Sequence, residues 1–268
     1  MNLHEFQAKE LFESYDLPVS KRGLIKELSD IDSAIDSIDF SNGCVAKVQA
    51  HTGGRGKVGG VKLCKNKEEI ENFASSWLGK NIVTNQTDEA GLPVNIITID
   101  ELTDIESELY MSLIVDRADK CVSMIVSKAG GMNIEEVAET NPEKILKLRF
   151  KKNNQAFDKE LDNLSSKLGF NSNQSTQFEK IVLNTYKLFM DKDLSLLEIN
   201  PLVITRKGDL HCLDAKINVD ENALYRQEEI LAKRDASQED QREYEAKQHD
   251  LSYVCLLYTS DAADDCRC

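Results

Sequence analysis

The chain has 268 residues, of which 41% are hydrophobic, and its formal net charge is -14 at neutral pH. This length and composition can build a hydrophobic core in one large or two modest domains, which argues against global disorder. The negative charge repels phosphate backbones and anionic lipids, which argues against nucleic acids and membrane surfaces as main partners. No run approaches the roughly 18 apolar residues that span a bilayer, no basic signal region opens the chain, and the scattered cysteines indicate reduced thiols in the cytoplasm.

Hydrophobic periodicity predicts helices and strands in alternation along the chain. The order begins with a helix after the capping pair Asn2 and Glu5, a helix over residues 26–38, strands over 44–50 and 60–64, and a helix from the cap Asn66 through Trp77. It continues with strands over 94–102, 108–115 and 121–127, helices over 158–168 and 175–190, and strands over 194–205 and 210–217. No long linker or repeat interrupts this mixed pattern of α and β elements.

The last residues, 255–268, hold three of the 7 cysteines and continue no recognisable element. We interpret them as a disordered end or as a segment foreign to the rest of the chain. Cys266 and Cys268 have the spacing of a metal-binding pair, but no other nearby ligand supports such a site.

A basic, glycine-rich stretch interrupts the acidic chain, because no acidic residue lies between Asp39 and Glu68. Residues 54–59 match the pattern G-x-G-x-x-G, but a strand rather than a helix is expected next, unlike in a dinucleotide-binding loop. Val58 stands where a P-loop has Ser or Thr, and the His-Arg-Asp and Asp-Phe-Gly motifs of protein kinases are absent. What remains is a glycine hairpin over nucleotide phosphates, with Lys47 and Arg55 supplying positive charge, or a flexible exposed turn.

A second hairpin is predicted around residues 206–208, whose sequence Arg-Lys-Gly suits a three-residue loop with glycine in the left-handed conformation. The resulting register pairs Thr205 with Asp209, Asn200 with Asp214, and Glu198 with Lys216. Since side chains alternate between faces, the last four of these residues share one face. Carboxylate and amide oxygens in this arrangement suit Mg²⁺ together with substrate phosphates, and a polar sheet edge is the alternative.

Several blocks of the chain resemble the family of succinyl-CoA synthetase β subunits. They are residues 1–9, 47–62, 197–204, 213–216, 222–227 and 237–240, and the resemblance covers residues 1–254. It implies an α+β ATP-grasp fold over residues 1–240, with one subdomain at 21–102 and the other formed by 1–20 and 103–240. Residues 241–254 would then be a linker into a second α/β domain of the family that this chain lacks.

The resemblance also implies roles for individual residues. It places Lys47, Gly54, Arg55 and Gly56 at the phosphates of ATP or ADP, and Thr103 and Glu108 near the nucleotide. Asp100 stands where the family commonly has Glu, which keeps the carboxylate and shortens its reach. Asn200 and Asp214 match the family's Mg²⁺ ligands, the pair already reached from the hairpin register, and Glu198 beside them is expected to be catalytic.

The implied reaction is the reversible conversion of succinate, CoA and ATP into succinyl-CoA, ADP and phosphate, a step of the tricarboxylic acid cycle. A phosphohistidine on a partner α subunit, in a heterodimer or heterotetramer, carries the phosphoryl group, so no histidine of this chain needs to be a nucleophile. Without the second domain we expect this chain to lack full ligase activity. An inactive nucleotide-binding fragment, a malate–CoA ligase β subunit and the N-terminal part of ATP-citrate lyase remain alternatives, and the choice between ATP and GTP stays open.

Overall fold

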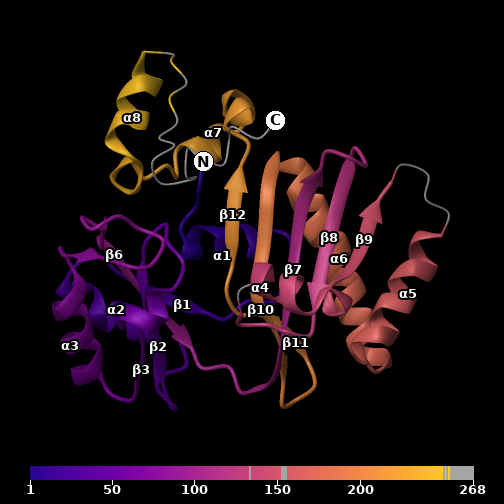
Figure 1. The fold of residues 1–268 in the computed structure, drawn as a ribbon. Coiled ribbons are helices and arrows are strands. Elements are labelled where there is room, and N and C mark those ends of the chain that lie inside the picture. The colour runs from indigo at the N-terminus through magenta and orange to yellow at the C-terminus, as the bar shows by residue number, and fades with distance from the viewer. Residues whose placement is uncertain (133, 152–155, 250, 252, 254–268) are drawn as a thin grey trace.

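Two antiparallel sheets, each with its own hydrophobic core, lie side by side in the structure (Figure 1). The computed structural model describes residues 1–132, 134–151, 156–249, 251 and 253. Among these residues, no helix is both long and apolar enough to cross a membrane. The mixed content of helix and sheet agrees with the α+β fold class expected from the sequence.

The smaller sheet has the strand order β1 (Arg22–Ile25), β6 (Ile96–Glu101), β2 (Cys44–Gln49), β3 (Val61–Cys64). Helices α2 (Ile31–Asp36) and α3 (Lys67–Trp77) pack against it. In β2 the apolar residues recur with period two, so that Cys44, Ala46 and Val48 are all buried in the same core. This core also contains Ile97 and Ile99 of β6 and Ile70 and Phe73 of α3.

The larger sheet has the order β11 (Leu210–Cys212), β10 (Leu194–Thr205), β7 (Ile105–Asp116), β8 (Cys121–Ser127), β9 (Leu146–Phe150), and β12 (Lys216–Val219) also pairs with β10. Helices α1 (Glu5–Ser14), α5 (Phe157–Leu168) and α6 (Ser172–Asp191) contribute apolar side chains to its core. Helix α1 lies on the side of this sheet that is nearer the small one (Figure 1). The N-terminal helix is therefore positioned to contact both sheets.

Several short elements complete the fold. They are β4 (Asn81–Ile82), β5 (Leu92–Pro93), α4 (Ile134–Thr140), α7 (Glu228–Leu231) and α8 (Gln241–Gln248). The sequence patterns did not predict β1, β4, β5, β9 or α4, all of which are short. Strands of two to five residues carry too little periodicity to be recognised without their pairing partners.

Strong patterns gave correct elements. Strands over 121–127 and 194–205 have the predicted bounds, and α5 and α6 differ from the predicted helices by a few residues at their ends. Asn66 caps α3 as expected, because its side chain accepts a hydrogen bond from the Glu69 N–H at 2.9 Å. The predicted division into subdomains at residues 21–102 stays a prediction, although the two separate cores agree with it.

Three predictions were wrong in detail. Helix α1 begins after His4, whose capping partner is Gln7, because residues 1–3 extend along β12 through hydrogen bonds such as Leu3 N to Ile217 O. Residues 26–38 form a 3₁₀ turn followed by the short α2, since the Asp30 carboxylate accepts from two backbone N–H groups before the helix starts. The strand over 210–217 is divided into β11 and β12, opposite Pro201, which has no N–H to donate. Residues 255–268 lie outside the described residues.

Candidate functional site

The glycine-rich stretch forms a hairpin between two strands, as predicted. β2 and β3 pair antiparallel with Lys47 opposite Val61, and the Val48 N–H donates to Gly60 O at 2.8 Å. Gly54 and Gly59 have φ values of +73° and +82°, which residues with a Cβ rarely adopt. Between them residues Arg55–Val58 make one 3₁₀ turn that brings Arg55 back beneath β2, where it donates to Val48 O at 2.7 Å.

The second hairpin has the predicted register. Glu198 lies opposite Lys216 and Val203 opposite His211, and Gly208 has a φ of +87° in the turn. Between the two ladders, Asn200 and Asp214 lie at the break between β11 and β12. Their side chains, with that of Glu198, are partly exposed on the same cavity.

A cavity of about 400 Å³ lies where the two hairpins meet the N-terminal segment. From the second hairpin it is lined by Glu198, Asn200, Asp214 and Lys216, and from the glycine hairpin by Thr52, Gly53, Gly54, Arg55 and Lys57. Other parts of its wall include Glu5, Asn85, Gln86 and the segment around Gly131 and Glu135. Anionic and cationic side chains thus face one cavity from separate elements.

A buried ion network lies directly behind this cavity. The Lys47 ammonium group is 2.8 Å from Glu5 Oε1 and 3.2 Å from Asp100 Oδ2. Arg55 Nη2 is 2.8 Å from Glu5 Oε2 and 3.6 Å from Asp214 Oδ2. Lys9 closes the network, with its Nζ at 2.9 Å from Glu5 Oε1 and 2.6 Å from Asp100 Oδ2.

These contacts keep the network charged despite its burial. Burial raises the pKa of Glu5, but the surrounding Lys47, Lys9 and Arg55 outweigh it, so that this pKa lies well below its usual value. The pKa of Asp100 is lowered in the same way, because Lys47 and Lys9 outweigh the effect of burial. Burial lowers the pKa of Lys47, yet Glu5 and Asp100 raise it above the ordinary value. Glu5, Asp100 and Lys47 are therefore all ionised at neutral pH.

The acidic side of the cavity behaves differently. Burial raises the pKa of Glu198, and burial together with Glu5 raises the pKa of Asp214. Their negative charge is thus incompletely balanced by the protein, which suits the addition of a cation. Between them, Asn200 Oδ1 accepts from the Gly131 N–H at 2.8 Å, and Asn200 Nδ2 donates to Met132 O at 3.2 Å.

The donor set fits Mg²⁺, which takes oxygen ligands and needs few from the protein when phosphates supply others. The described residues contain no group of three His, Cys, Asp or Glu side chains able to hold a metal ion by themselves. A site built from Asp214, Glu198 and the Asn200 amide oxygen is therefore suited to a cation that arrives with an anionic ligand.

The structure brings some of the predicted site residues to the cavity and leaves others away from it. Gly54, Arg55, Glu198, Asn200 and Asp214 line it, whereas Lys47 reaches it only through Glu5. The remaining predicted residues are absent from its lining: Gly56, Asp100, Thr103 and Glu108.

Three of these residues have contacts or pairing partners elsewhere in the fold: Asp100, Thr103 and Glu108. Asp100 is 3% exposed and pairs with Lys9 and Lys47. The Thr103 hydroxyl lies 3.2 Å from that of Ser20, at the connection between the sheets. Glu108 lies on β7 opposite Val203 of β10.

Sequence reasoning missed the contribution of Glu5 and Lys9. Their spacing of four residues on a helix is the signal for a pair on one helix face, and the pair is 2.9 Å apart in α1. It also missed Gln238, whose side chain accepts from the His51 N–H at 3.1 Å and donates to Pro93 O at 2.8 Å. The contact with His51 holds the start of the glycine loop and has no local sequence signal.

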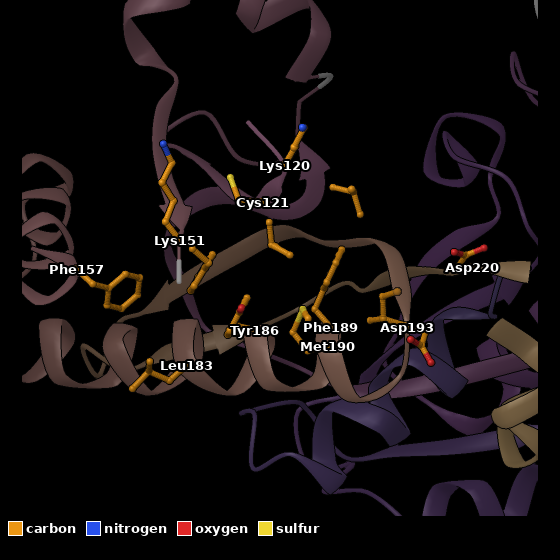
Figure 2. Close-up of a pocket in the computed structure, with 14 residues that line it drawn as sticks. Lys120, Cys121, Lys151, Phe157, Leu183, Tyr186, Phe189, Met190, Asp193 and Asp220 are labelled. Atoms are coloured by element: carbon orange, nitrogen blue, oxygen red, sulfur yellow. The ribbon is translucent and has the colours of Figure 1, made fainter. Parts of the chain in front are cut away.

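A second cavity, of about 770 Å³, lies between α6 and the strands β8 and β9 (Figure 2). Its floor is aromatic, with the Phe150 and Tyr186 rings stacked at a centroid distance of 4.1 Å. The amino groups of Lys120 and Lys151 point away from this floor (Figure 2). The lining of this second cavity includes the carboxylates of Asp193 and Asp220 but no glycine loop, and Asp193 is already paired with Arg226. The first cavity is therefore the better candidate for a site that binds phosphates.

Comparisons with known proteins identify the family of the chain. A protein-family model described as the ATP-grasp domain matches residues 2–204. Two curated relatives are "Succinate--CoA ligase [ADP-forming] subunit beta" proteins, from Saccharophagus degradans at 50% identity and Pseudomonas aeruginosa at 49% identity, each over 256 residues. The match covers 96% of this chain and 66% of each relative, so the chain spans just under two thirds of their length.

Solved structures show the same fold at low identity. ATP citrate lyase from Methanothrix soehngenii, in complex with citrate and coenzyme A, has a TM-score of 0.66 and 18% identity, over 93% of this chain and 59% of that one. The Ca. Korarchaeum cryptofilum protein ACD1, in complex with coenzyme A, has a TM-score of 0.61 and 16% identity, over 82% of this chain and 93% of that one. With the family match over most of its length, the chain belongs to the ATP-grasp family and is similar to the β subunits of succinate–CoA ligases.

Proposed function

We propose that this chain is the nucleotide-binding part of the β subunit of an ADP-forming succinate–CoA ligase. The observation that carries the proposal is the meeting of a glycine hairpin and a carboxylate–amide hairpin at one cavity, with Arg55 in its wall and Lys47 behind it, both held by Glu5. The reaction is the one for which relatives that are 50% and 49% identical are named.

In this proposal the chain performs the nucleotide half of the reaction. Arg55, Lys47 and the backbone N–H groups around Gly54 bind the phosphates of ATP or ADP, and Asn200 and Asp214 hold Mg²⁺. When bound, the metal neutralises negative charge on the phosphates and polarises the bond to the transferred phosphoryl group. Glu198 is the catalytic candidate because it lines the same cavity next to Asn200. Catalysis then consists of positioning and charge stabilisation by groups that are already in place.

The proposal includes a partner subunit and a location in the cell. The phosphoryl group passes between the nucleotide and a phosphohistidine on an α subunit, and succinate and CoA are the other substrates. A cytoplasmic location is supported by the free thiols of Cys44, Cys64, Cys121 and Cys212.

The binding half of the proposal is tested by calorimetry of the chain with Mg²⁺ and ATP, ADP or GTP. We expect saturable binding of ADP and of at least one nucleoside triphosphate. The ratio of the affinities for ATP and GTP gives the base preference. Absence of heat with all three nucleotides would refute the proposal.

The transfer half is tested with the α subunit of such a ligase and ATP labelled at the γ-phosphate. The label should appear on a histidine of the α subunit when this chain and Mg²⁺ are present, and should disappear when the chain is omitted. Release of the label by CoA with succinate, but not with malate or citrate, distinguishes this ligase from its sister enzymes.

A further inference from the structure

The N-terminal block MNLHEFQAK contributes to the resemblance, but the proposed phosphate and metal contacts leave it without a role. The structure places its acidic residue, Glu5, at the first position of α1, with its side chain 3% exposed and at the wall of the cavity. Its two carboxylate oxygens contact different cations. Oε1 is 2.8 Å from Lys47 Nζ, and Oε2 is 2.8 Å from Arg55 Nη2.

The charges around Glu5 are not balanced within the buried network. Three cations, Lys9, Lys47 and Arg55, share the two buried carboxylates of Glu5 and Asp100. Asp214, 3.6 Å from Arg55, is a further anion beside the network, and the proposed metal site uses it as a ligand. Once a cation occupies that site, the cluster has an excess of positive charge that an anionic ligand can satisfy.

Glu5 also connects cations that would otherwise separate. Lys47 lies on β2 of the small sheet and Arg55 lies in the loop after it, whereas Glu5 belongs to the helix of the large sheet. The positive charges of Lys47 and Arg55 repel each other in a buried site, and an anion between them offsets this repulsion. A carboxylate that accepts from both fixes the distance and direction of the two cationic groups at once.

We propose that Glu5 is a positioning residue that orders Lys47 and Arg55 for phosphate binding before the nucleotide arrives. The inference rests on the proposed function, since it concerns the phosphates of the nucleotide bound there. Such ordering lowers the cost of immobilising two long side chains at the moment of binding. The lowered pKa of Glu5 reflects the same ion pairs, because Lys47 and Arg55 stabilise its ionised form.

The test is the affinity of Mg²⁺–ATP for the Glu5→Gln variant, measured by calorimetry. Glutamine keeps the shape but brings an NH₂ group against cations that are themselves donors, so we expect binding to weaken by about tenfold or more. Glu5→Asp keeps the charge with a shorter reach and should recover part of the affinity. The matched control is Glu13→Gln on the same helix. Its half-exposed carboxylate pairs with Arg22, neither residue lines the cavity, and the variant should bind as the wild type does.

A double-mutant cycle separates positioning from a merely structural role. If Glu5 acts through Lys47, then Glu5→Gln in a Lys47→Met background should weaken binding by no more than about twofold. A structural role would give the same loss in both backgrounds, and this result would overturn the inference. Wild-type affinity in both Glu5→Gln and Glu5→Asp would do so as well. If Glu5→Gln fails to fold, Glu5→Asp and its cycle with Lys47→Met decide the question.

The same binding measurements distinguish a failure of the proposed function from a failure of the inference about Glu5. If the wild-type chain does not bind Mg²⁺–ATP, the proposed function fails and the inference fails with it. If the wild type binds and the variants at position 5 bind equally well, the inference alone fails.

Discussion

His4 and His51 face each other with their ring centroids 4.4 Å apart, where the start of α1 meets the start of the glycine loop. His4 Nε2 lies 2.9 Å from Asp235 Oδ2, while His4 Nδ1 and His51 Nε2 have no hydrogen-bond partner among the described residues. Burial, with His4 as the next cause, lowers the pKa of His51 to about 4. Burial also lowers the pKa of His4, although Asp235 opposes it. Two rings in contact therefore remain neutral at pH 7.

This contact predicts a loss of stability in mild acid. Because the pKa of His51 is lower in the folded state, the unfolded chain binds more protons below pH 6.5, and the folded state loses stability as the pH falls towards 4. Between pH 7.5 and pH 5, His51 alone should cost about 2 kcal/mol. Urea unfolding at both pH values should show this loss in the wild type and a smaller one in His51→Gln. The exposed His249 provides the control, since His249→Gln should leave the pH dependence unchanged.

The metal proposal predicts the effect of removing one negative ligand. Asp214→Asn should weaken Mg²⁺-dependent ATP binding by at least about tenfold, because an amide replaces the charged oxygen donor. Calorimetry with and without Mg²⁺ checks this, and binding without the metal should change much less. Asp209→Asn on the same hairpin, where the carboxylate accepts from Gln177 at the surface, should bind normally. Unchanged Mg²⁺ dependence in Asp214→Asn would contradict the assignment.

Asp100 is predicted to contribute to stability through its buried ion pairs with Lys9 and Lys47. Asp100→Asn leaves Lys9, which is 1% exposed, with less compensation and should reduce the free energy of unfolding by about 3 kcal/mol. Asp32→Asn removes a carboxylate from an exposed ion pair with Lys67, and it should change the free energy of unfolding by no more than about 0.5 kcal/mol. Chemical denaturation at pH 7 compares the two. Equal effects would show that the buried pair is not required.

Gly23 is predicted to be irreplaceable for steric reasons. It lies in β1, where α2 crosses so closely that an added Cβ would collide with the backbone of Ala34. Gly23→Ala should therefore destabilise the small sheet by about 3 kcal/mol or more, because the helix must move. Gly56→Ala is the control for stability, since its added Cβ meets no atom within 4 Å. A Gly23→Ala protein with wild-type unfolding would mean that α2 can shift without cost.

The parts of the fold that the sequence predicted are those where neighbours along the chain decide the structure. The register of β10 with β11 and β12 followed from Gly208 and the period of two, and it placed Glu198, Asn200 and Asp214 on one cavity. The glycine hairpin was recognisable for the same reason, because its positive φ angles need residues without a Cβ.

The rest depends on contacts between distant segments. That Glu5 on α1 binds Lys47 on β2 follows from the packing of two sheets, which no periodicity encodes. Resemblance placed Asp100, Thr103 and Glu108 near the nucleotide, whereas here they do not line the cavity, and their contact with nucleotide stays a prediction. The short β9 forms because β8 offers it an edge, so its own sequence was insufficient to reveal it.

The side chain of Gln238 has a consequence for how the protein is made. Its contact with the His51 N–H joins positions that are 187 residues apart, and it also binds Pro93 O in the small sheet. The first residues of the glycine loop therefore lack one of their fixed contacts until the ribosome has synthesised almost the whole of this chain. Interactions of such high sequence separation form late in folding. During synthesis, the loop proposed to hold the nucleotide phosphates is completed after the strands on either side of it.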